Sequence, residues 1–345
     1  MTAVFDGHND ALGKLQSGDD DPAAFLTGLP ERQLDLPRAR AGGLGGALFA
    51  VNAPSPDDDA WDTASLSDMP YAGPVDHAQA AAFTAGALGR GHALAAASDG
   101  AVAVVTDVAG LDRCHADGTL AMVLHLEGAE AVDPGLSALD AWHAAGVRSI
   151  GLVWSRPSAF GHGVPFRFPA SPDTGPGLTD AGRALVRRCA ELGVVVDLSH
   201  LNAAGFADVV RIAATPIVIS HTACHALCPS TRNLTDDQLR DVARSDGLVG
   251  IVFCPAFLRA DGTDDADTPL ATLVAHVRHA AELVGVERVG LGSDFDGAPM
   301  PAELADVAAL PRLLDALRDD GFSADEVQGI AWGNWRRVLA AVWGL

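Results

Sequence analysis

The stretch VFDGHND at residues 4–10 decides between the fold classes that the rest of the sequence allows. Its first two residues are apolar, as at the start of a buried strand. His8 and Asp10 are two residues apart, so on an extended backbone their side chains point to one face. An imidazole and a carboxylate aimed at one point form half of a metal site. A doubly wound sheet would normally carry a glycine-rich phosphate turn at this position instead.

Short apolar runs alternate with helical patterns along the chain. The runs VVVDL at 194–198 and PIVIS at 216–220 are apolar on both faces, as strands buried beneath helices are. Helices of ten or more residues separate such runs, which indicates βαβ units and a parallel sheet. Further strands are predicted at 45–51, 101–105, 120–126, 147–154, 248–253 and 288–292, giving nine with the one that precedes His8.

These nine strands favour a (β/α)8 barrel of TIM-like or distorted form. Eight strands close the barrel if 101–105 is an accessory strand, and helices follow the last strand. An open doubly wound sheet is the alternative, which the missing glycine-rich turn disfavours. With 345 residues, 48% of them hydrophobic, the chain can bury a large core, and we predict a single domain over 1–345.

The segments between the predicted strands contain sequence patterns typical of helices and loops. Helices are predicted over 75–97, 136–145 and, after a capping Thr179, up to Leu192. The segment after Asp10, up to Pro37, is predicted to be a polar connection, and 54–74 a surface loop.

The charge balance excludes some partners. There are 23 basic and 45 acidic residues, a net charge of -22, which argues against nucleic acid or an anionic membrane surface. The start lacks a basic and apolar leader, and no apolar run is long enough to span a bilayer. The five cysteines show no zinc-finger or CxxC pattern. We therefore expect a cytoplasmic protein with reduced thiols.

Ionisable residues occur at the ends of several predicted strands. In a (β/α)8 barrel the C-terminal strand ends converge on one mouth, where the active site is built. Three histidines and two carboxylates suit zinc or a similar divalent ion. The residues are His8, Asp10, Glu127, His200 and His221, with Asp294 as a sixth.

Five ligands exceed what one catalytic zinc uses, so we predict two Zn²⁺ ions per chain, or similar divalent ions. His8 and Asp10 would hold one ion and His200 and His221 the other, with Glu127 bridging them. Two such ions can share a hydroxide whose pKa is brought toward neutrality.

Asp294 is predicted to be the general base and acid that handles the proton of this hydroxide. Asp296, two residues later, is the alternative proton carrier. Asp197, three residues before His200, is predicted to orient a metal ligand, and His125 is either a supporting partner of Glu127 or a core residue.

The remaining histidines have simpler interpretations. His225 is predicted to be a loop or helix-start residue rather than a ligand, and His276 and His279 to lie on an outer barrel face.

The sequence resembles the membrane (renal) dipeptidase family, the M19 metallopeptidases among the amidohydrolase-like barrels. The motifs span nearly the whole chain in the family's order. They are DGHND at 6–10, LEG at 126–128, DLSH at 197–200, SHTACHAL at 220–227, STRN at 230–233, GSDFDG at 292–297 and GNWRRV at 333–338.

The resemblance implies a binuclear zinc dipeptidase in which Glu127 bridges the metals and Asp294 carries the proton. It also implies that Arg232 pairs with the carboxylate of a small dipeptide substrate, for which a guanidinium is suited. Family members accept a D-residue at the C-terminal position, and the resemblance suggests a homodimer.

One departure concerns the substrate pocket. The family's typical members carry a substrate-contacting histidine after the fourth strand, where this chain has Trp154. His162 and Arg156, on the same loop, are the candidates to replace the imidazole. The family's aromatic hydroxyl near the seventh strand is also absent, because Cys254 follows Phe253 there.

We therefore predict a zinc-dependent dipeptidase with Arg232, Trp154 and His162 as substrate-binding residues. The alternatives are another binuclear amidohydrolase, acting on N-acyl amino acids or lactams, and a non-catalytic barrel. The first is motivated by the Trp154 and Cys254 departures.

Overall fold

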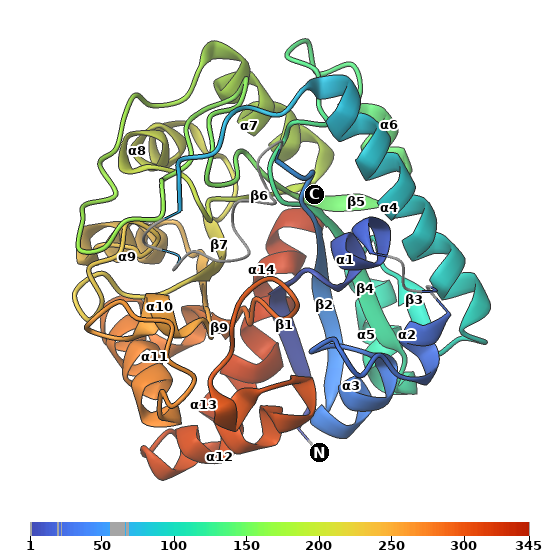
Figure 1. Cartoon of the computed structure of the whole chain (residues 1–345), viewed down its shortest axis with the longest axis vertical. Helices are drawn as coiled ribbons and strands as arrows, with labels where there is room; N and C mark the ends of the chain where they lie inside the picture. Colours follow the sequence, from blue (N-terminus) through green and yellow to red (C-terminus); the bar gives the residue numbers. More distant parts are fainter. Residues whose placement is uncertain (1, 19–20, 22, 56–65, 67–68, 345) are drawn as a thin grey trace.

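The computed structural model describes residues 2–18, 21, 23–55, 66 and 69–344. Nine parallel strands form one sheet in the order β2-β1-β9-β8-β7-β6-β5-β4-β3, and β2 also pairs with β4. This extra pairing closes eight strands into the predicted barrel (Figure 1). The barrel strands are β1 (Val4–Asn9), β2 (Leu44–Val51), β4 (Leu120–Leu126), β5 (Val147–Gly151), β6 (Val195–Asp197), β7 (Val218–Thr222), β8 (Leu248–Ile251) and β9 (Val289–Leu291).

The ninth strand, β3 (Val102–Val104), is the predicted accessory strand. It pairs with the first half of β4, where Val104 lies opposite Met122. The second half of the same β4 edge pairs with β5, where Leu126 lies opposite Ile150. Because the two strands share one edge, β3 stays outside the closed ring.

Helices connect successive strands and surround the barrel (Figure 1). They are α4 (His77–Ala97), α5 (Val108–Asp117), α6 (Leu139–Ala144), α7 (Asp180–Leu192), α8 (Ala203–Ile212), α9 (Asp236–Arg244), α10 (Pro255–Leu258) and α11 (Leu270–Val284), followed after β9 by α12 (Leu310–Asp319), α13 (Ala324–Gln328) and α14 (Asn334–Trp343). Single 3-10 turns span Val286–Arg288, Ala302–Leu304 and Val307–Ala309, and a π-helical turn, Gly329–Gly333, joins α13 to α14. The predicted cap is confirmed, since the Thr179 side chain accepts from the backbone N–H of Gly182.

The prediction of a polar connection after Asp10 was wrong. That segment contains α1 (Ala11–Ser17) and α2 (Ala24–Thr27), and α3 (Leu36–Gly42) starts at its end. Leu12 and Phe25 are fully buried against the barrel core, and such tertiary burial stabilises helices too short to be evident from composition. In the predicted loop 54–74, residues 56–65 and 67–68 lie outside the described part.

Trp335 of α14 packs into the barrel from the side opposite the strand ends that carry the site. Its ring centroid lies 5.4 Å from that of Phe5, and its indole N–H donates to the carbonyl of Leu291 at 2.9 Å. Gly7 leaves the room for this ring, because a Cβ on it would lie 2.3 Å from Cζ2 of Trp335. The glycine between Asp6 and His8 is therefore a packing requirement.

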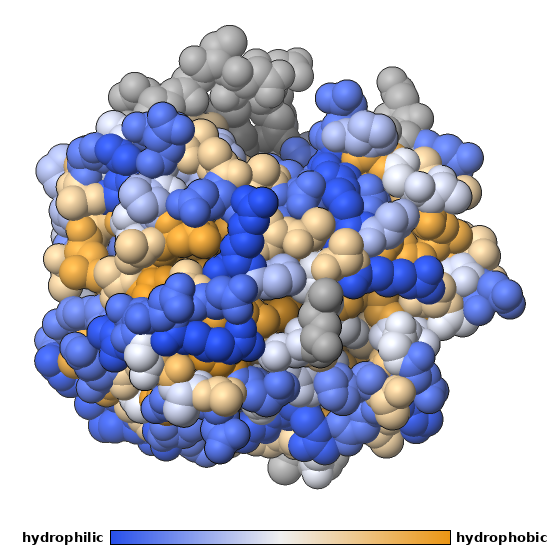
Figure 2. All heavy atoms as spheres, turned by 90° about the horizontal axis from the view of Figure 1, so that it is seen from below, coloured by the Kyte–Doolittle hydropathy of each residue, from blue (hydrophilic) through white to orange (hydrophobic). Residues whose placement is uncertain are grey.

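Figure 2 shows hydrophilic side chains spread over one face with apolar atoms between them. Among the described residues, Tyr71 is the large hydrophobic side chain that is exposed, at 42%. None of the helices described is both long and apolar enough to cross a membrane.

Candidate metal centre and active site

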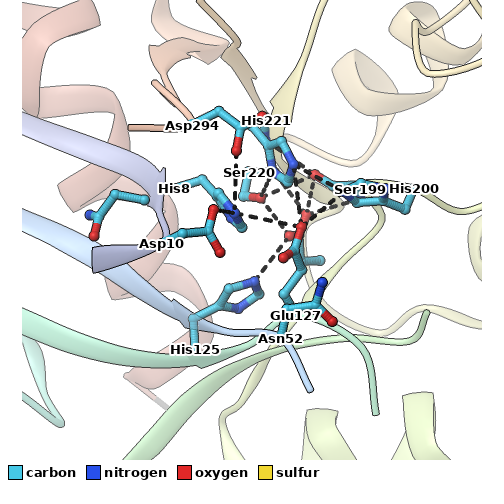
Figure 3. Close-up of polar contacts among 12 residues, drawn as sticks. His8, Asp10, Asn52, His125, Glu127, Ser199, His200, Ser220, His221 and Asp294 are labelled. Carbon is cyan, nitrogen blue, oxygen red and sulfur yellow. Dashed lines mark hydrogen bonds and ion pairs between the residues drawn. The ribbon is translucent and has the colours of Figure 1, made fainter. Parts of the chain in front are cut away.

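Six predicted site residues converge at the C-terminal ends of the barrel strands (Figure 3). They are His8 and Asp10 at β1, Glu127 at β4, His200 at β6, His221 at β7 and Asp294 at β9. The sequence suggests that His221 follows its strand, whereas β7 runs on to Thr222 and includes it. The separate strand ends thus bring together residues that are up to 286 positions apart in the numbering, from His8 to Asp294.

The backbone adopts a left-handed conformation at two of these residues. The φ angle is 66° at His200 and 68° at Asp294. Non-glycine residues rarely adopt such angles, and those that do are concentrated at functional sites, where the surrounding structure enforces them.

Glu127 lies at the junction of the three imidazoles. Its Oε1 is 2.9 Å from Nε2 of His200, 3.5 Å from Nε2 of His8 and 3.6 Å from Nε2 of His221. The predicted ligand pairs are adjacent, with His8 Nε2 3.4 Å from Asp10 Oδ2 and His200 Nε2 3.1 Å from His221 Nε2. Oε1 of Glu127 therefore lies within 3.6 Å of an imidazole from each predicted ligand pair.

The ring nitrogens fit a divalent cation. Nδ1 of His200 is 2.8 Å from the Ser155 hydroxyl and Nδ1 of His221 is 2.8 Å from the Ser220 hydroxyl, so both rings turn Nε2 inward. Burial lowers the pKa of both imidazoles well below its usual value, which leaves them neutral and able to ligate. Both ring nitrogens of His8 are buried without a hydrogen-bond partner in the described part of the chain.

The carboxylates favour positive charge at the same point. Burial opposes a charge on His8, yet Glu127, Asp10 and Asp294 together raise the pKa of its imidazole to about 10. Burial in turn raises the pKa of Glu127 to about 8 and that of Asp294 to about 6. The ligand atoms of His8, Glu127 and His221 lie within 4.8 Å of one another, as do those of His8, Asp10 and Asp294. The donor set therefore suits divalent metal.

Asp197 supports a predicted metal ligand, as the sequence suggests, and that ligand is His221. Its Oδ2 accepts a hydrogen bond of 2.5 Å from the Ser220 hydroxyl, which in turn contacts His221. Asp197 therefore orients His221 rather than His200. His125 is fully buried; its Nδ1 lies 2.9 Å from the Ser149 hydroxyl, and its Nε2 faces Asp197 Oδ2 at 3.5 Å rather than Glu127.

Asp6 supports the site although its sequence position suggested no role. Its Oδ1 accepts from the Ser293 backbone N–H at 2.7 Å and its Oδ2 from the Ser293 hydroxyl at 2.8 Å. These bonds tie β1, which carries His8, to the turn that carries Asp294. The available signal was the alternation of Asp6, His8 and Asp10, although alternation does not identify Ser293, after β9, as the partner of Asp6.

The two candidate proton carriers differ in their surroundings. Asp294 lines the cavity above the site, and its side chain is 13% exposed. Asp296 is not among the cavity-lining residues, and its Oδ1 accepts a 2.6 Å hydrogen bond from the backbone N–H of Gln33. The geometry favours Asp294.

A cavity of about 700 Å³ opens onto this cluster. Its volume is typical of small-molecule sites. The site residues Asp10, Glu127, His200 and Asp294 contribute to its lining. The other lining residues are Gly13, Lys14, Ser17, Asn52, Pro54, Leu66, Met69, Phe83, Trp154, Phe166, Phe257, Asp264, Gly297, Ala298 and Pro299.

The loop after β5 places Trp154, but not His162, at this cavity. Trp154 lines the cavity. His162 is half-buried, is not among the cavity-lining residues, and forms an isolated antiparallel β-bridge with Pro157. Arg156 is fully buried, and its Nε donates to Glu130 at 2.7 Å, so it supports Trp154 rather than entering the cavity.

Arg232 is not among the cavity-lining residues; it is 4% exposed and lies behind Phe257, which lines the cavity. One guanidinium N–H donates to the carbonyl of His221 at 3.1 Å, and its Cζ lies 5.5 Å from the ring centroid of Phe257. Its Nε is buried without a hydrogen-bond partner in the described chain. Burial lowers the pKa of this guanidinium, while the carboxylates of Asp294 and Glu127 oppose that shift.

The other histidines lie away from the cluster. Nε2 of His225 is 3.0 Å from the carbonyl of Ala170, consistent with a loop residue. His279 pairs with Asp236 at 2.8 Å and is partly exposed. The outer-face prediction is wrong for His276, which is 1% exposed; in its buried position the ring accepts from the backbone N–H of Cys224 and contacts the carbonyl of Leu258.

Comparison with known proteins shows a match along the whole chain. The family model of the membrane dipeptidases (peptidase family M19) matches residues 1–343. A protein encoded in the pqqA 5′ region of Klebsiella pneumoniae is 48% identical over 250 residues, 72% of this chain and 92% of its own length. The dipeptidase aclJ of Aspergillus oryzae is 35% identical over 66% of this chain and 53% of its own length.

A solved structure shares the fold over almost the full length. The crystal structure of a metallo peptidase from Rhodobacter sphaeroides, liganded with a phosphinate mimic of the dipeptide L-Ala-D-Ala, superposes with a TM-score of 0.95. It is 42% identical and covers 99% of each chain. A dipeptidase of family M19 superposes with a TM-score of 0.94 at 42% identity, covering 100% of both chains.

Proposed function

This chain belongs to the membrane dipeptidase family, peptidase family M19, and we propose that it hydrolyses free dipeptides with two zinc or similar divalent ions. The observation that carries the proposal is the convergence of three imidazoles on Oε1 of Glu127, at a cavity that Asp294 also lines. The dipeptide mimic bound by the Rhodobacter sphaeroides metallo peptidase supports the substrate class.

His8 and Asp10 would hold one ion and His200 and His221 the other, with Glu127 between them. The buried, unpartnered ring nitrogens of His8 and the inward Nε2 atoms of the other two histidines support this set. When bound, the ions would act as Lewis acids on the scissile carbonyl and lower the pKa of the attacking water.

Asp294 is proposed as the general base and acid. It takes a proton from the attacking water and delivers it to the leaving nitrogen. Burial raises the pKa of its carboxyl to about 6, toward the range of a general base. Its partial exposure at the cavity places the carboxylate within reach of a substrate.

Arg232 is proposed to bind the substrate's C-terminal carboxylate. A guanidinium offers two parallel N–H donors to a carboxylate, and the unpartnered Nε supports this role. We extend the proposal to dipeptides with a C-terminal D-residue, as the resemblance implies. The homodimer and the cytoplasmic location remain predictions.

The test is a substrate panel with zinc-reconstituted protein whose metal content is measured. Free dipeptides with L- and D-residues at the C-terminal position are compared with N-acetyl amino acids and lactams. Hydrolysis of dipeptides is expected. Turnover of the N-acyl compounds or lactams alone would favour the other amidohydrolase reaction, for which Trp154 at the cavity is the motivating observation. About two ions per chain without any hydrolysis would favour a non-catalytic barrel.

A further inference from the structure

We propose that this protein prefers dipeptides whose C-terminal residue has a large apolar side chain, above all an aromatic one. Trp154, Phe166 and Phe257, here called the aromatic wall, would bind that side chain. The inference rests on the proposed function, because that function fixes where the substrate's carboxylate and scissile carbonyl lie.

The aromatic wall is a continuous surface of three rings that all line the cavity. The ring centroids of Trp154 and Phe166 are 5.6 Å apart with an interplanar angle of 70°, an edge-to-face contact. Those of Phe166 and Phe257 are 6.0 Å apart at 17°, nearly parallel. Such surfaces bind apolar and aromatic groups through burial and ring contacts together.

The wall runs from the metal cluster to the carboxylate-binding residue. At one end, the ring centroid of Trp154 is 5.7 Å from that of His200. At the other, Cζ of Arg232 lies 5.5 Å from the centroid of Phe257. A dipeptide's C-terminal Cα lies between its carboxylate and its scissile amide. In one of the two configurations of that residue, L or D, the side chain on this Cα therefore lies along the aromatic wall.

Trp154 is held in place from behind by buried charges. Cζ of Arg156 is 5.2 Å from its ring centroid. The Arg156 guanidinium is fixed by Nε donating to Glu130 at 2.7 Å and Nη2 donating to Asn52 at 2.7 Å. A ring held in this way loses little further freedom on binding, which favours affinity for a flat apolar partner.

The experiment measures kcat/KM of the zinc-reconstituted protein for L-Ala–Xaa dipeptides, with Xaa as Ala, Leu, Phe, Lys or Glu in both configurations. In the accepted configuration, Phe should exceed Ala by at least about tenfold, and Lys and Glu should fall below Phe. Hydrolysis with Ala equal to Phe, or with Lys or Glu preferred, would overturn this inference alone. No hydrolysis of any dipeptide would overturn the proposed function and this inference with it.

A variant ties the preference to the wall. Phe166→Leu should lower the Phe-to-Ala ratio of kcat/KM about fivefold, because the middle ring of the wall is lost. The matched control is Phe322→Leu. It removes a ring that, like Phe257 of the wall, packs against an arginine (Cζ of Arg278 at 4.4 Å), but Phe322 does not line the cavity. The control should leave the ratio unchanged. Equal ratios in Phe166→Leu and unmodified protein would contradict the assignment of the wall.

Discussion

Nε2 of His200 and Nε2 of His221 face each other at 3.1 Å, between the ends of β6 and β7. Serine hydroxyls contact Nδ1 of both rings, so each ring can present the lone pair of Nε2. Two facing lone pairs repel each other unless a cation satisfies them. With both Nε2 lone pairs directed inward, this pair of nitrogens suits a shared cation.

Removing divalent metal should destabilise the protein. Ions that bind the folded chain at 1,000 times their Kd contribute about 4 kcal/mol to the free energy of unfolding. We expect chelation to lower Tm and added zinc to restore it, as measured by calorimetry. An unchanged Tm after metal removal, verified by elemental analysis, would contradict this expectation.

The Ser220 hydroxyl should matter to metal affinity without touching the metal. It connects His221 to Asp197, and loss of such a partner weakens metal binding about 10–100-fold. Ser220→Ala should therefore show this loss in competition with a chromophoric chelator.

The control for Ser220→Ala is Ser98→Ala. Ser98 is also buried, and its hydroxyl donates to the carbonyls of Ala95 and Val102, in a segment that contributes no site residue. It should leave metal affinity unchanged. Equal affinities in both variants would remove Ser220 from the supporting network.

Much of the fold could be predicted from the sequence because its signals are local. The apolar run at 194–198 and the breakers around it are sufficient to predict β6, and alternation after Val4 is sufficient to place His8 and Asp10 on one face. The short helices α1 and α2 could not be predicted, because burial of Leu12 and Phe25 against distant strands stabilises them.

Contacts between distant parts of the sequence also limited what could be predicted of the site. The ligand-bearing strand ends were predictable, since each His or acid follows an apolar run. The supporting contacts were not, because Asp197 meets Ser220 and Asp6 meets Ser293 only after the barrel closes. The burial of His276 likewise depends on backbone groups from other segments.

Gly7→Ala should destabilise the barrel. The new methyl would lie 2.3 Å from Trp335 and 2.5 Å from the carbonyl of Ser220, and overpacking of this kind costs about 3 kcal/mol. Gly89→Ala is the control. A Cβ at Gly89, on the exposed side of α4, would have no neighbouring atom within 4 Å, so this variant should instead raise the free energy of unfolding by about 0.5–1 kcal/mol. Urea unfolding measures both changes. Equal stability of the two variants would contradict the packing role of Gly7.

His276 should make stability fall with decreasing pH. Burial lowers the pKa of its imidazole to about 4, whereas an unfolded histidine titrates near 6.5. Between pH 6.5 and pH 4 this histidine is protonated in the unfolded chain but neutral in the folded one, so acid favours unfolding. The stability that His276 contributes is therefore complete above pH 6.5 and is lost as the pH falls toward 4. From pH 7 to pH 5 the loss should be about 2 kcal/mol.

Urea unfolding in excess chelator, at both pH values, isolates this effect from metal release. His276→Leu should be less stable at pH 7, because the N–H of Cys224 loses its partner, yet should show a flatter pH dependence. The same pH dependence in both proteins would exclude His276 as its source.

The most direct test of the account is the Asp294→Asn variant, assayed for metal content and dipeptide turnover on the same sample. Asparagine keeps the size of the side chain and tolerates the φ of 68°, but it cannot accept the proton. The account predicts that kcat falls by about 10²–10⁴-fold while the metal content equals that of the unmodified protein. Loss of both metal and turnover, or of neither, would contradict the role assigned to Asp294.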